Sequence, residues 1–354
     1  MSDLYLSRVR NWFLSSPPAE WVLSQLHEVF IGSLKQGPIP RHVAFIMDGN
    51  RRYAKSHKIE TIEGHHLGFE ALAGMLEVCF KCGVEVVTIY AFSVENFNRP
   101  QYEVDGLMQL AKLKMEQLVQ HGSLLERYGA GVRVLGQREL LSPDVLEVFD
   151  RVARLTKDNN NHILNICFPY TSRAEITSAV RSTIEEYTTT PRPHNTPFSQ
   201  SRIAQKIQAK QGNKTESLSS VREASPPPPS PRSDDPDGSV SSSATLYQED
   251  SPKSGTPTPQ VTIYPNAENI TAETIDSHMY TAGCPPLDLY IRTSGVERLS
   301  DFMLWQCHQD TQIFFLKCLW PEFGLWDFLP VLVEWQWRQK QKEREKPSQR
   351  VKQA

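Results

Sequence analysis

The chain has 354 residues and a formal net charge of −3, with 38 Lys and Arg against 41 Asp and Glu. A near-neutral chain with no basic patch in its folded part is not expected to bind nucleic acid. No run of about 18 apolar residues occurs, which excludes a spanning helix, and no secretory signal pattern is present. The six cysteines lie mostly in apolar runs, as expected of reduced thiols facing the cytosol.

One stretch has the composition of a disordered segment. Residues 211–260 contain nine prolines, twelve serines, four threonines and three glycines. Such a stretch buries too little apolar surface to offset the entropy lost on ordering, so we expect a disordered insertion at 188–262. The rest is long enough for a single α/β domain. The expected parts are an N-terminal amphipathic segment at 1–36, a domain formed by 37–187 and 263–340, and a basic C-terminal tail at 341–354.

The two ends of the chain each allow two interpretations. The N-terminal segment carries bulky apolar groups such as Trp12, Phe13 and Trp21. It is either a surface helix packed on the domain or a helix lying in a membrane interface. The stretch after Trp337 carries seven Lys or Arg against two Glu. It is either a solvated helix end or a contact with an anionic membrane surface.

Taken in chain order, six short runs rich in Val, Ile, Leu and Phe are expected to be strands. They lie at 42–48, 85–92, 132–136, 163–168, 287–293 and 312–316. Helical patterns lie at 64–81, at 103–127, after the Ser142-Pro143 pair, and from a capping Ser172 toward Tyr187. This alternation predicts a mostly parallel six-stranded sheet flanked by helices. Because ligands bind beyond the carboxyl ends of strands in such sheets, the residues after each strand are the candidates for function.

A cluster suited to a metal-bound diphosphate follows the first predicted strand. Asp48 is a hard oxygen ligand that can share Mg²⁺ with phosphate. The backbone N–H groups of 49–52 can cradle phosphate oxygens at a helix start, and Arg52 can pair with phosphate through two hydrogen bonds. An ordinary turn with surface arginines is the alternative for this cluster taken alone.

Two further polar clusters follow the second and fifth predicted strands. Their members are Ser93, Asn96 and Arg99 in one, and Arg292, Arg298 and Ser300 in the other. Since the carboxyl ends of parallel strands share one edge of the sheet, three clusters favour a phosphate site more strongly than any one of them.

The segments around these clusters resemble the signatures of cis-prenyltransferases. The matching segments are 42–54, 90–100, 291–295, 298–302 and 319–323. The resemblance implies an enzyme that condenses isopentenyl diphosphate repeatedly onto an allylic diphosphate, farnesyl diphosphate, with cis double bonds and Mg²⁺ as the metal. It also implies a role in dolichol synthesis and protein glycosylation, as a peripheral protein on the cytosolic face of the endoplasmic reticulum membrane.

Residue roles are carried over from the resemblance to matching positions only. Asp48 is implied as the Mg²⁺-linked carboxylate, and the catalytic set is implied to be Asp48, Asn96 and Ser93. Allylic diphosphate binding is implied for Gly49, Asn50, Arg51, Arg52, His65 and Arg99, and isopentenyl diphosphate binding for Arg292, Arg298 and Ser300. The proton lost in each condensation goes either to the Asn96 and Ser93 neighbourhood or to a diphosphate oxygen.

Two departures from bacterial members point to the eukaryotic branch and to a partner. Arg51 stands where bacterial relatives usually have glycine, and Thr311, beside Asp310, stands where bacterial homodimers have a metal-linked Glu. Eukaryotic catalytic subunits in which this Glu is missing associate with a distinct, inactive subunit of the same fold. The resemblance therefore implies a hetero-oligomer. The alternative is that the chain is itself the non-catalytic subunit. Against it stands the presence of all six of Asp48, Arg52, Asn96, Arg99, Arg292 and Arg298.

Overall fold

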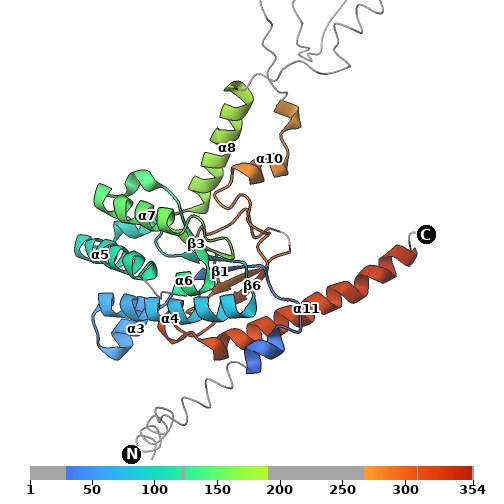
Figure 1. Cartoon of the computed structure of the whole chain (residues 1–354), viewed down its shortest axis with the longest axis horizontal. Helices are drawn as coiled ribbons and strands as arrows, with labels where there is room; N and C mark the ends of the chain where they lie inside the picture. The colour runs from blue at the N-terminus through green and yellow to red at the C-terminus, as the bar shows by residue number, and fades with distance from the viewer. Residues whose placement is uncertain (1–28, 121–123, 190–266, 309, 353–354) are drawn as a thin grey trace, which may run out of the picture. The chain divides into compact units, whose positions relative to one another are not determined.

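The computed structural model describes residues 29–120, 124–189, 267–308 and 310–352 (Figure 1). The chain divides into one compact unit formed by Met1–Glu186 and Ile270–Ala354, which holds the site, and a second at Tyr187–Asn269. The predicted insertion lies outside the described residues except for its first two positions, which belong to a helix. Most of the predicted N-terminal segment also lies outside them, and residues 29–34 are helical.

Six strands form one sheet in the order β3-β4-β2-β1-β5-β6, and every pairing is parallel. Their bounds are His42–Ile46 (β1), Val86–Tyr90 (β2), Ala130–Leu135 (β3), His162–Cys167 (β4), Leu289–Arg292 (β5) and Gln312–Phe315 (β6). The predicted six-stranded parallel sheet is therefore confirmed. The first strand ends at Ile46 rather than at Asp48, so the aspartate lies beyond the hydrogen-bonded ladder.

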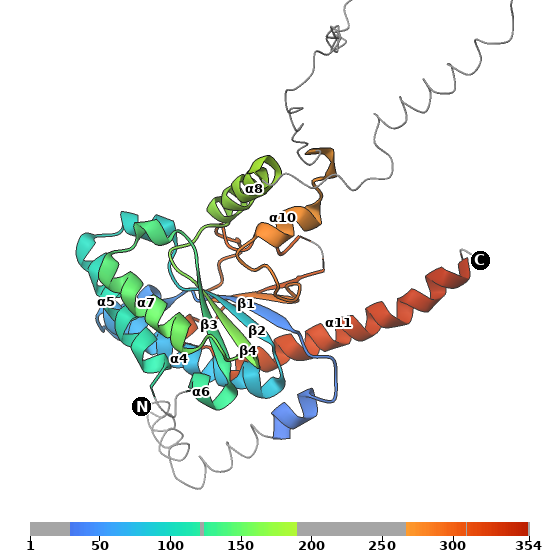
Figure 2. The same cartoon turned by 45° about the horizontal axis from the view of Figure 1, so that its top comes forward.

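Side chains of each strand alternate between two apolar clusters, one on each face of the sheet. In β1, Val43 and Phe45 join the first cluster, and Ala44 and Ile46 join the second. Residues of α4 (Thr61–Cys82), α5 (Gln101–Leu118), α7 (Pro143–Leu155) and α11 (Leu325–Lys352) are among those that pack in the first cluster. Figures 1 and 2 show α4, α5 and α7 grouped on one side of the sheet, with α8 (Ser172–Thr189) and α10 (Ala272–His278) on the other.

Several predicted helix boundaries change. The helix predicted at 103–127 is two helices, α5 and α6 (Leu124–Tyr128), and residues 121–123 lie outside the described part. The sequence there includes Gly122 and Ser123, which propagate a helix poorly. The tail predicted from 341 is helical as far as Lys352, as part of α11. Pro143 is the first residue of α7 and follows Ser142 at the N-cap position, as predicted.

The remaining elements are short. They are the helix α3 (Asn50–His57) and the 3₁₀ turns Val94–Asn98 (η1), Arg138–Leu140 (η2), Ala267–Asn269 (η3) and Trp320–Glu322 (η4). Among the described residues, no helix combines the length and apolar character needed to cross a membrane.

Candidate active site

The segments that follow β1 and β5, two neighbouring strands, leave on opposite faces of the sheet. After β1 the chain leads through α3 into α4, whose residues pack in the first apolar cluster. After β5 it passes through Phe302 and Met303, which lie in the second cluster. Ligand crevices in parallel sheets form where adjacent connections diverge in this way. Asp48, just after β1, and Arg292, the last residue of β5, meet at this point.

The carboxylate of Asp48 is held by three neighbours. Its Oδ2 accepts hydrogen bonds from Arg292 Nη2 at 2.9 Å and from the Ser294 hydroxyl at 2.8 Å, and its Oδ1 lies 3.5 Å from Arg52 Nη2. Burial opposes ionisation of Asp48, but the hydrogen bonds from Ser294 and Arg292 and the charges of Arg292 and Arg52 outweigh it. The pKa of Asp48 therefore falls below its ordinary value, and the carboxylate is ionised at neutral pH.

Ser294 is a site residue that the sequence analysis did not single out. Its φ of 86° lies in the left-handed region, which a residue with a Cβ adopts only when its surroundings hold it there. Its N–H donates to the carbonyl of Cys318 at 2.7 Å, and its carbonyl accepts a hydrogen bond from Arg52 Nη1 at 2.9 Å. This backbone geometry directs the hydroxyl to Asp48. A polar residue just before Gly295 at a strand end was the available signal.

Arg292 joins the end of β5 to the loop that carries Arg298 and Ser300. Its Nη1 donates to the carbonyl of Arg298 at 2.5 Å and to the hydroxyl of Ser300 at 2.6 Å. The Nε of Arg298 lies 3.2 Å from the same hydroxyl. The side chain of Arg292 is only 4% exposed, and its Nε has no hydrogen-bond partner within the described structure. A buried, unsatisfied guanidinium N–H beside a pocket suits an anionic ligand.

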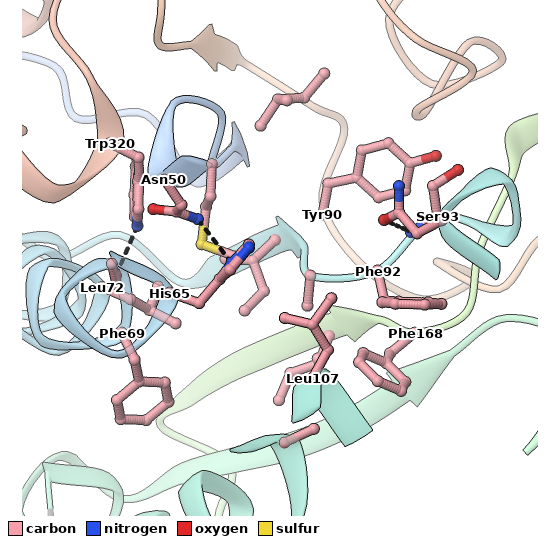
Figure 3. Close-up of a pocket in the computed structure, with 18 of the residues that line it drawn as sticks. Asn50, His65, Phe69, Leu72, Tyr90, Phe92, Ser93, Leu107, Phe168 and Trp320 are labelled. Atoms are coloured by element: carbon pink, nitrogen blue, oxygen red, sulfur yellow. Dashed lines mark hydrogen bonds between the residues drawn. The ribbon is translucent and has the colours of Figure 1, made fainter. Parts of the chain in front are cut away.

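Asn50 and His65 face one another across a close contact of α3 and α4 (Figure 3). Asn50 Nδ2 lies 3.3 Å from His65 Nδ1, while Asn50 Oδ1 and His65 Nε2 have no partner among the described residues. Burial, reinforced by the charge of Arg99, lowers the pKa of His65 to about 4, so the ring is neutral at neutral pH. Gly68 makes room for this pair, because a Cβ there would lie 2.4 Å from Asn50 Oδ1.

The predicted cluster after β2 forms a capped turn. The N–H of Ser93 donates to Asn96 Oδ1 at 3.0 Å, and the hydroxyl of Ser93 accepts from the N–H of Glu95 at 3.2 Å. These two bonds make a capping box at the start of η1. Ser93 and Asn96 therefore shape the turn as well as lining the pocket.

Glu103 is a second site residue that sequence reasoning missed. Its side chain is 4% exposed, and its Oε1 lies 2.9 Å from Arg99 Nη1 and 3.6 Å from Arg51 Nε. A buried carboxylate between two arginines fixes their position at the site. The spacing of four residues between Arg99 and Glu103, two residues of opposite charge, was the available signal.

Most of these groups line one pocket of about 360 Å³, and Ser294 and Glu103 contact residues that line it. Its polar end contains Asp48, Asn50, His65, Ser93, Glu95, Asn96, Arg99, Arg292, Arg298 and Ser300. Gly49, Arg51 and Arg52 do not line it; Arg51 instead pairs with Glu103, and Arg52 pairs with Asp48. Figure 3 shows Phe69, Leu107, Phe92 and Phe168 along the apolar part of the same pocket.

A single buried charge interrupts the apolar wall. Lys114 lines the pocket, its side chain is 6% exposed, and its Nζ lies 3.0 Å from Glu70 Oε1 and 4.7 Å from the centre of the Phe69 ring. The wall is otherwise formed by residues such as Leu110, Met115, Leu118, Phe149, Leu164 and Ile166.

The donor set can be compared with the needs of Mg²⁺. The described residues contain no group of three His, Cys, Asp or Glu placed to hold a metal ion. Asp48 offers an ionised carboxylate whose Oδ2 is already hydrogen bonded, which leaves Oδ1 beside Arg52 as the free ligand. Mg²⁺ commonly binds through one or two carboxylates together with substrate phosphates and water. The residues present fit that mode and do not fit an all-protein cage.

Thr311 and Asp310 lie away from Asp48. The Thr311 hydroxyl donates to the carbonyl of Leu287 at 2.7 Å. Thr311 precedes β6 and Leu287 precedes β5, so this contact lies at the amino end of the sheet. Asp310 pairs with Lys342 of α11 at 3.0 Å. Within this chain, neither Thr311 nor Asp310 contributes to the described site at the carboxyl end of β1.

Comparison with known proteins assigns the chain to a family. The family model described as undecaprenyl diphosphate synthase matches residues 46–222 and 241–343. The chain therefore belongs to the undecaprenyl diphosphate synthase family, the cis-prenyltransferases, as the sequence motifs indicated.

Individual relatives agree with this assignment. A dehydrodolichyl diphosphate synthase complex subunit of Schizosaccharomyces pombe is 38% identical, over 94% of this chain and 98% of the relative. The Homo sapiens subunit of the same name is 34% identical, over 86% of this chain and 69% of that protein. Lavandulyl diphosphate synthase from Lavandula x intermedia shares the fold, with a TM-score of 0.56 and 23% identity over 84% of this chain and 95% of that one.

Proposed function

We propose that the chain is the catalytic subunit of a dehydrodolichyl diphosphate synthase. It would extend farnesyl diphosphate by repeated condensation with isopentenyl diphosphate, forming cis double bonds, to supply dolichol synthesis and protein glycosylation. The observation that carries the proposal is the pocket itself. One end is polar and holds an ionised Asp48 beside Arg292, and the other is walled by apolar side chains. This pairing suits a diphosphate head with a growing prenyl chain.

The charged groups divide between two diphosphates in this proposal. Arg292, Arg298 and Ser300 form one connected set, which would bind isopentenyl diphosphate. Asn50 and the backbone at the start of α3 would bind the allylic diphosphate, with Arg99 opposite and His65 as a neutral donor. Arg51 and Arg52 would act indirectly, Arg51 through its ion pair with Glu103 and Arg52 through its ion pair with Asp48.

The reaction forms one carbon–carbon bond and breaks one C–O bond and one C–H bond. The double bond of isopentenyl diphosphate attacks the allylic carbon as the C–O bond to the leaving diphosphate breaks, and a proton is then lost. Positive side chains at the polar end stabilise the negative charge that develops on the leaving group. Bound Mg²⁺, held by Asp48 and phosphate oxygens, would supply further neutralisation of that charge. Since a serine hydroxyl and an asparagine amide are weak bases, a diphosphate oxygen is the favoured proton acceptor.

A partner subunit and a membrane surface complete the proposal. The S. pombe and human relatives are named as subunits of a complex. Asp310 and Thr311 lie at the far end of the strands, so this chain supplies no second carboxylate to Asp48 from there. We therefore propose that a second, inactive subunit of the same fold completes the site. The long lipid product and the amphipathic N-terminal sequence support peripheral association with the cytosolic face of the endoplasmic reticulum.

Incorporation of labelled isopentenyl diphosphate into chloroform-soluble product tests this function. The chain is assayed with farnesyl diphosphate and Mg²⁺, alone and with the partner subunit, beside Asp48→Ala. Long product that needs the partner and disappears in Asp48→Ala supports the proposal. Strong activity of the chain alone would remove the partner requirement. No product from a verified complex would favour the non-catalytic subunit.

A further inference from the structure

The loop after β5 that presents Arg298 and Ser300 has an unusual backbone. Ser300, Asp301 and Met303 have φ angles of 49°, 58° and 48°, in the left-handed region that residues other than glycine rarely adopt. Conformations of this kind persist when surrounding contacts fix them. One anchor is apolar, because the Phe302 ring stacks on Tyr90 with centroids 4.7 Å apart. The polar anchor lies on α8.

Asp301 joins this loop to the first turn of α8. Its carbonyl accepts from the N–H of Ser172 at 2.7 Å, its Oδ1 accepts from the N–H of Arg173 at 3.0 Å, and its Oδ2 accepts from Arg173 Nε at 2.7 Å. These bonds satisfy two of the free N–H groups at the helix start. Asp301 thus performs the capping role that the sequence predicted for Ser172, whose hydroxyl instead accepts from the N–H of Leu304 at 2.9 Å.

The contact continues along α8 through a buried carboxylate. Glu175 Oε1 accepts from Gln306 Nε2 at 3.1 Å and from the N–H of Tyr280 at 2.9 Å. On the other side, Arg173 Nη2 lies 3.7 Å from Glu95 of the turn after β2. Asp301, Ser172 and Arg173 do not line the pocket of the site. They therefore act on the loop and not on a bound ligand.

We propose that Asp301 is a positioning residue, which places Ser300 and Arg298 against Arg292 by fixing the loop to the start of α8. This inference rests on the proposed function, because it assigns those three side chains to isopentenyl diphosphate. Two bonds of the Asp301 side chain and one of its carbonyl hold the strained turn. When the side-chain bonds are lost, Ser300 moves relative to Arg292, and the half of the site that binds isopentenyl diphosphate is lost first.

Steady-state kinetics of the complex test the proposal, with Asp301→Ala, Asp301→Asn and the control Asp144→Asn. Asp144 also makes an ion pair at a helix start, with Lys112 at 2.6 Å, but lies outside the site. Asp301→Ala should raise the KM for isopentenyl diphosphate by roughly tenfold or more and leave the KM for farnesyl diphosphate within about twofold. Asp301→Asn keeps an oxygen that accepts from the N–H of Arg173, so it should recover most of the loss. Asp144→Asn should match the unmodified chain.

Hydrogen exchange of the same proteins gives a readout that does not need activity. Asp301→Ala should speed exchange of the amides of Ser172 and Arg173 and of the 298–304 segment, while α4 and α7 stay unchanged. Equal rises in both KM values, or faster exchange throughout the domain, would show a general structural role and overturn the proposal. Unchanged kinetics and exchange would also overturn it. If exchange changes as expected but the unmodified complex makes no product, the proposed function fails, and the role in isopentenyl diphosphate binding fails with it.

Discussion

The guanidinium of Arg292 donates a hydrogen bond to Oδ2 of Asp48 at 2.9 Å, although 244 positions separate the two residues in the chain. The parallel pairing of β1 with β5 places Ile46 beside Arg292, so the residues that follow these strands meet. The same guanidinium contacts Ser300, and Asp48 also accepts from Ser294. One buried arginine thus joins the carboxylate proposed to hold the metal to the loop proposed to bind isopentenyl diphosphate.

Removing the Ser294 hydroxyl is expected to shift the pH dependence of activity. The folded chain lowers the pKa of Asp48, and Ser294→Ala removes the larger of the hydrogen bonds that lower it. The pKa should therefore rise toward its ordinary value. The acid limb of kcat/KM, measured against pH, should move to higher pH. Ser56→Ala, which removes an exposed hydroxyl of α3, serves as the control. An unmoved acid limb in Ser294→Ala would show that Asp48 does not control it.

A matched pair of glycines in α4 tests the close approach of α3. A Cβ at Gly68 would lie 2.4 Å from Asn50 Oδ1 and 3.1 Å from Trp320. A Cβ at Gly74 would have no described heavy atom within 4 Å apart from its chain neighbours and the nearby backbone of its own helix. Gly68→Ala should displace Asn50, lower kcat/KM for farnesyl diphosphate by about tenfold or more, and lower the melting temperature. Gly74→Ala should retain activity and stabilise the chain by about 1 kcal/mol, because alanine is the better helix former. A fully active Gly68→Ala would show that the Asn50 position is not needed.

Lys114 is expected to limit product length. A prenyl chain that fills the apolar part of the pocket must pass its ammonium group, and contact with an apolar chain removes water from that charge. Lys114→Met keeps a long side chain without the charge, so it should shift the product distribution toward longer chains. Lys112→Met alters a lysine of the same helix that pairs with Asp144 and does not line the pocket. Chromatography of dephosphorylated products measures both, and an unchanged distribution in Lys114→Met would contradict the prediction.

His42 should make the fold less stable in mild acid. Burial lowers the pKa of His42 from its ordinary 6.5 to about 4, while its ring forms hydrogen bonds with the Pro285 carbonyl at 3.0 Å and the Thr88 hydroxyl at 2.7 Å. The unfolded chain therefore binds a proton that the folded chain does not. The stability is fully present above pH 6.5 and is lost as the pH falls toward 4, by about 1.4 kcal/mol per unit.

Denaturant unfolding between pH 7 and 4 measures this effect. His42→Gln should flatten the pH dependence of the unfolding free energy, whatever its cost at pH 7. His57→Gln changes an exposed histidine and should leave the slope as it is. Equal slopes in all three proteins would show that His42 does not carry this pH dependence.

The sheet and the polar clusters at its edge could be predicted from the amino-acid sequence. Runs of Val, Ile and Phe identify strands covered on both faces, and the residues after them carry the charge, because local pattern and strand alternation depend only on neighbouring positions. The motifs also indicated the family, because Asp48, Ser93, Asn96 and Arg292 lie at or just after the ends of predicted strands. The single long helix predicted at 103–127 was wrong, because the apolar stripe continues past the point where α5 ends.

Which side chains act together could not be predicted before the folded structure was known. In the sequence, Glu103 resembles any other helix residue. In the folded chain its side chain is buried and pairs with Arg99 and Arg51. Ser294 donates a hydrogen bond to Asp48 because its backbone is left-handed, a conformation that serine rarely adopts. The cap of α8 comes from Asp301, far along the chain, and not from the adjacent Ser172. Such contacts join positions brought together by strand order and burial, and their energies depend on distance in space, about which local sequence carries no information.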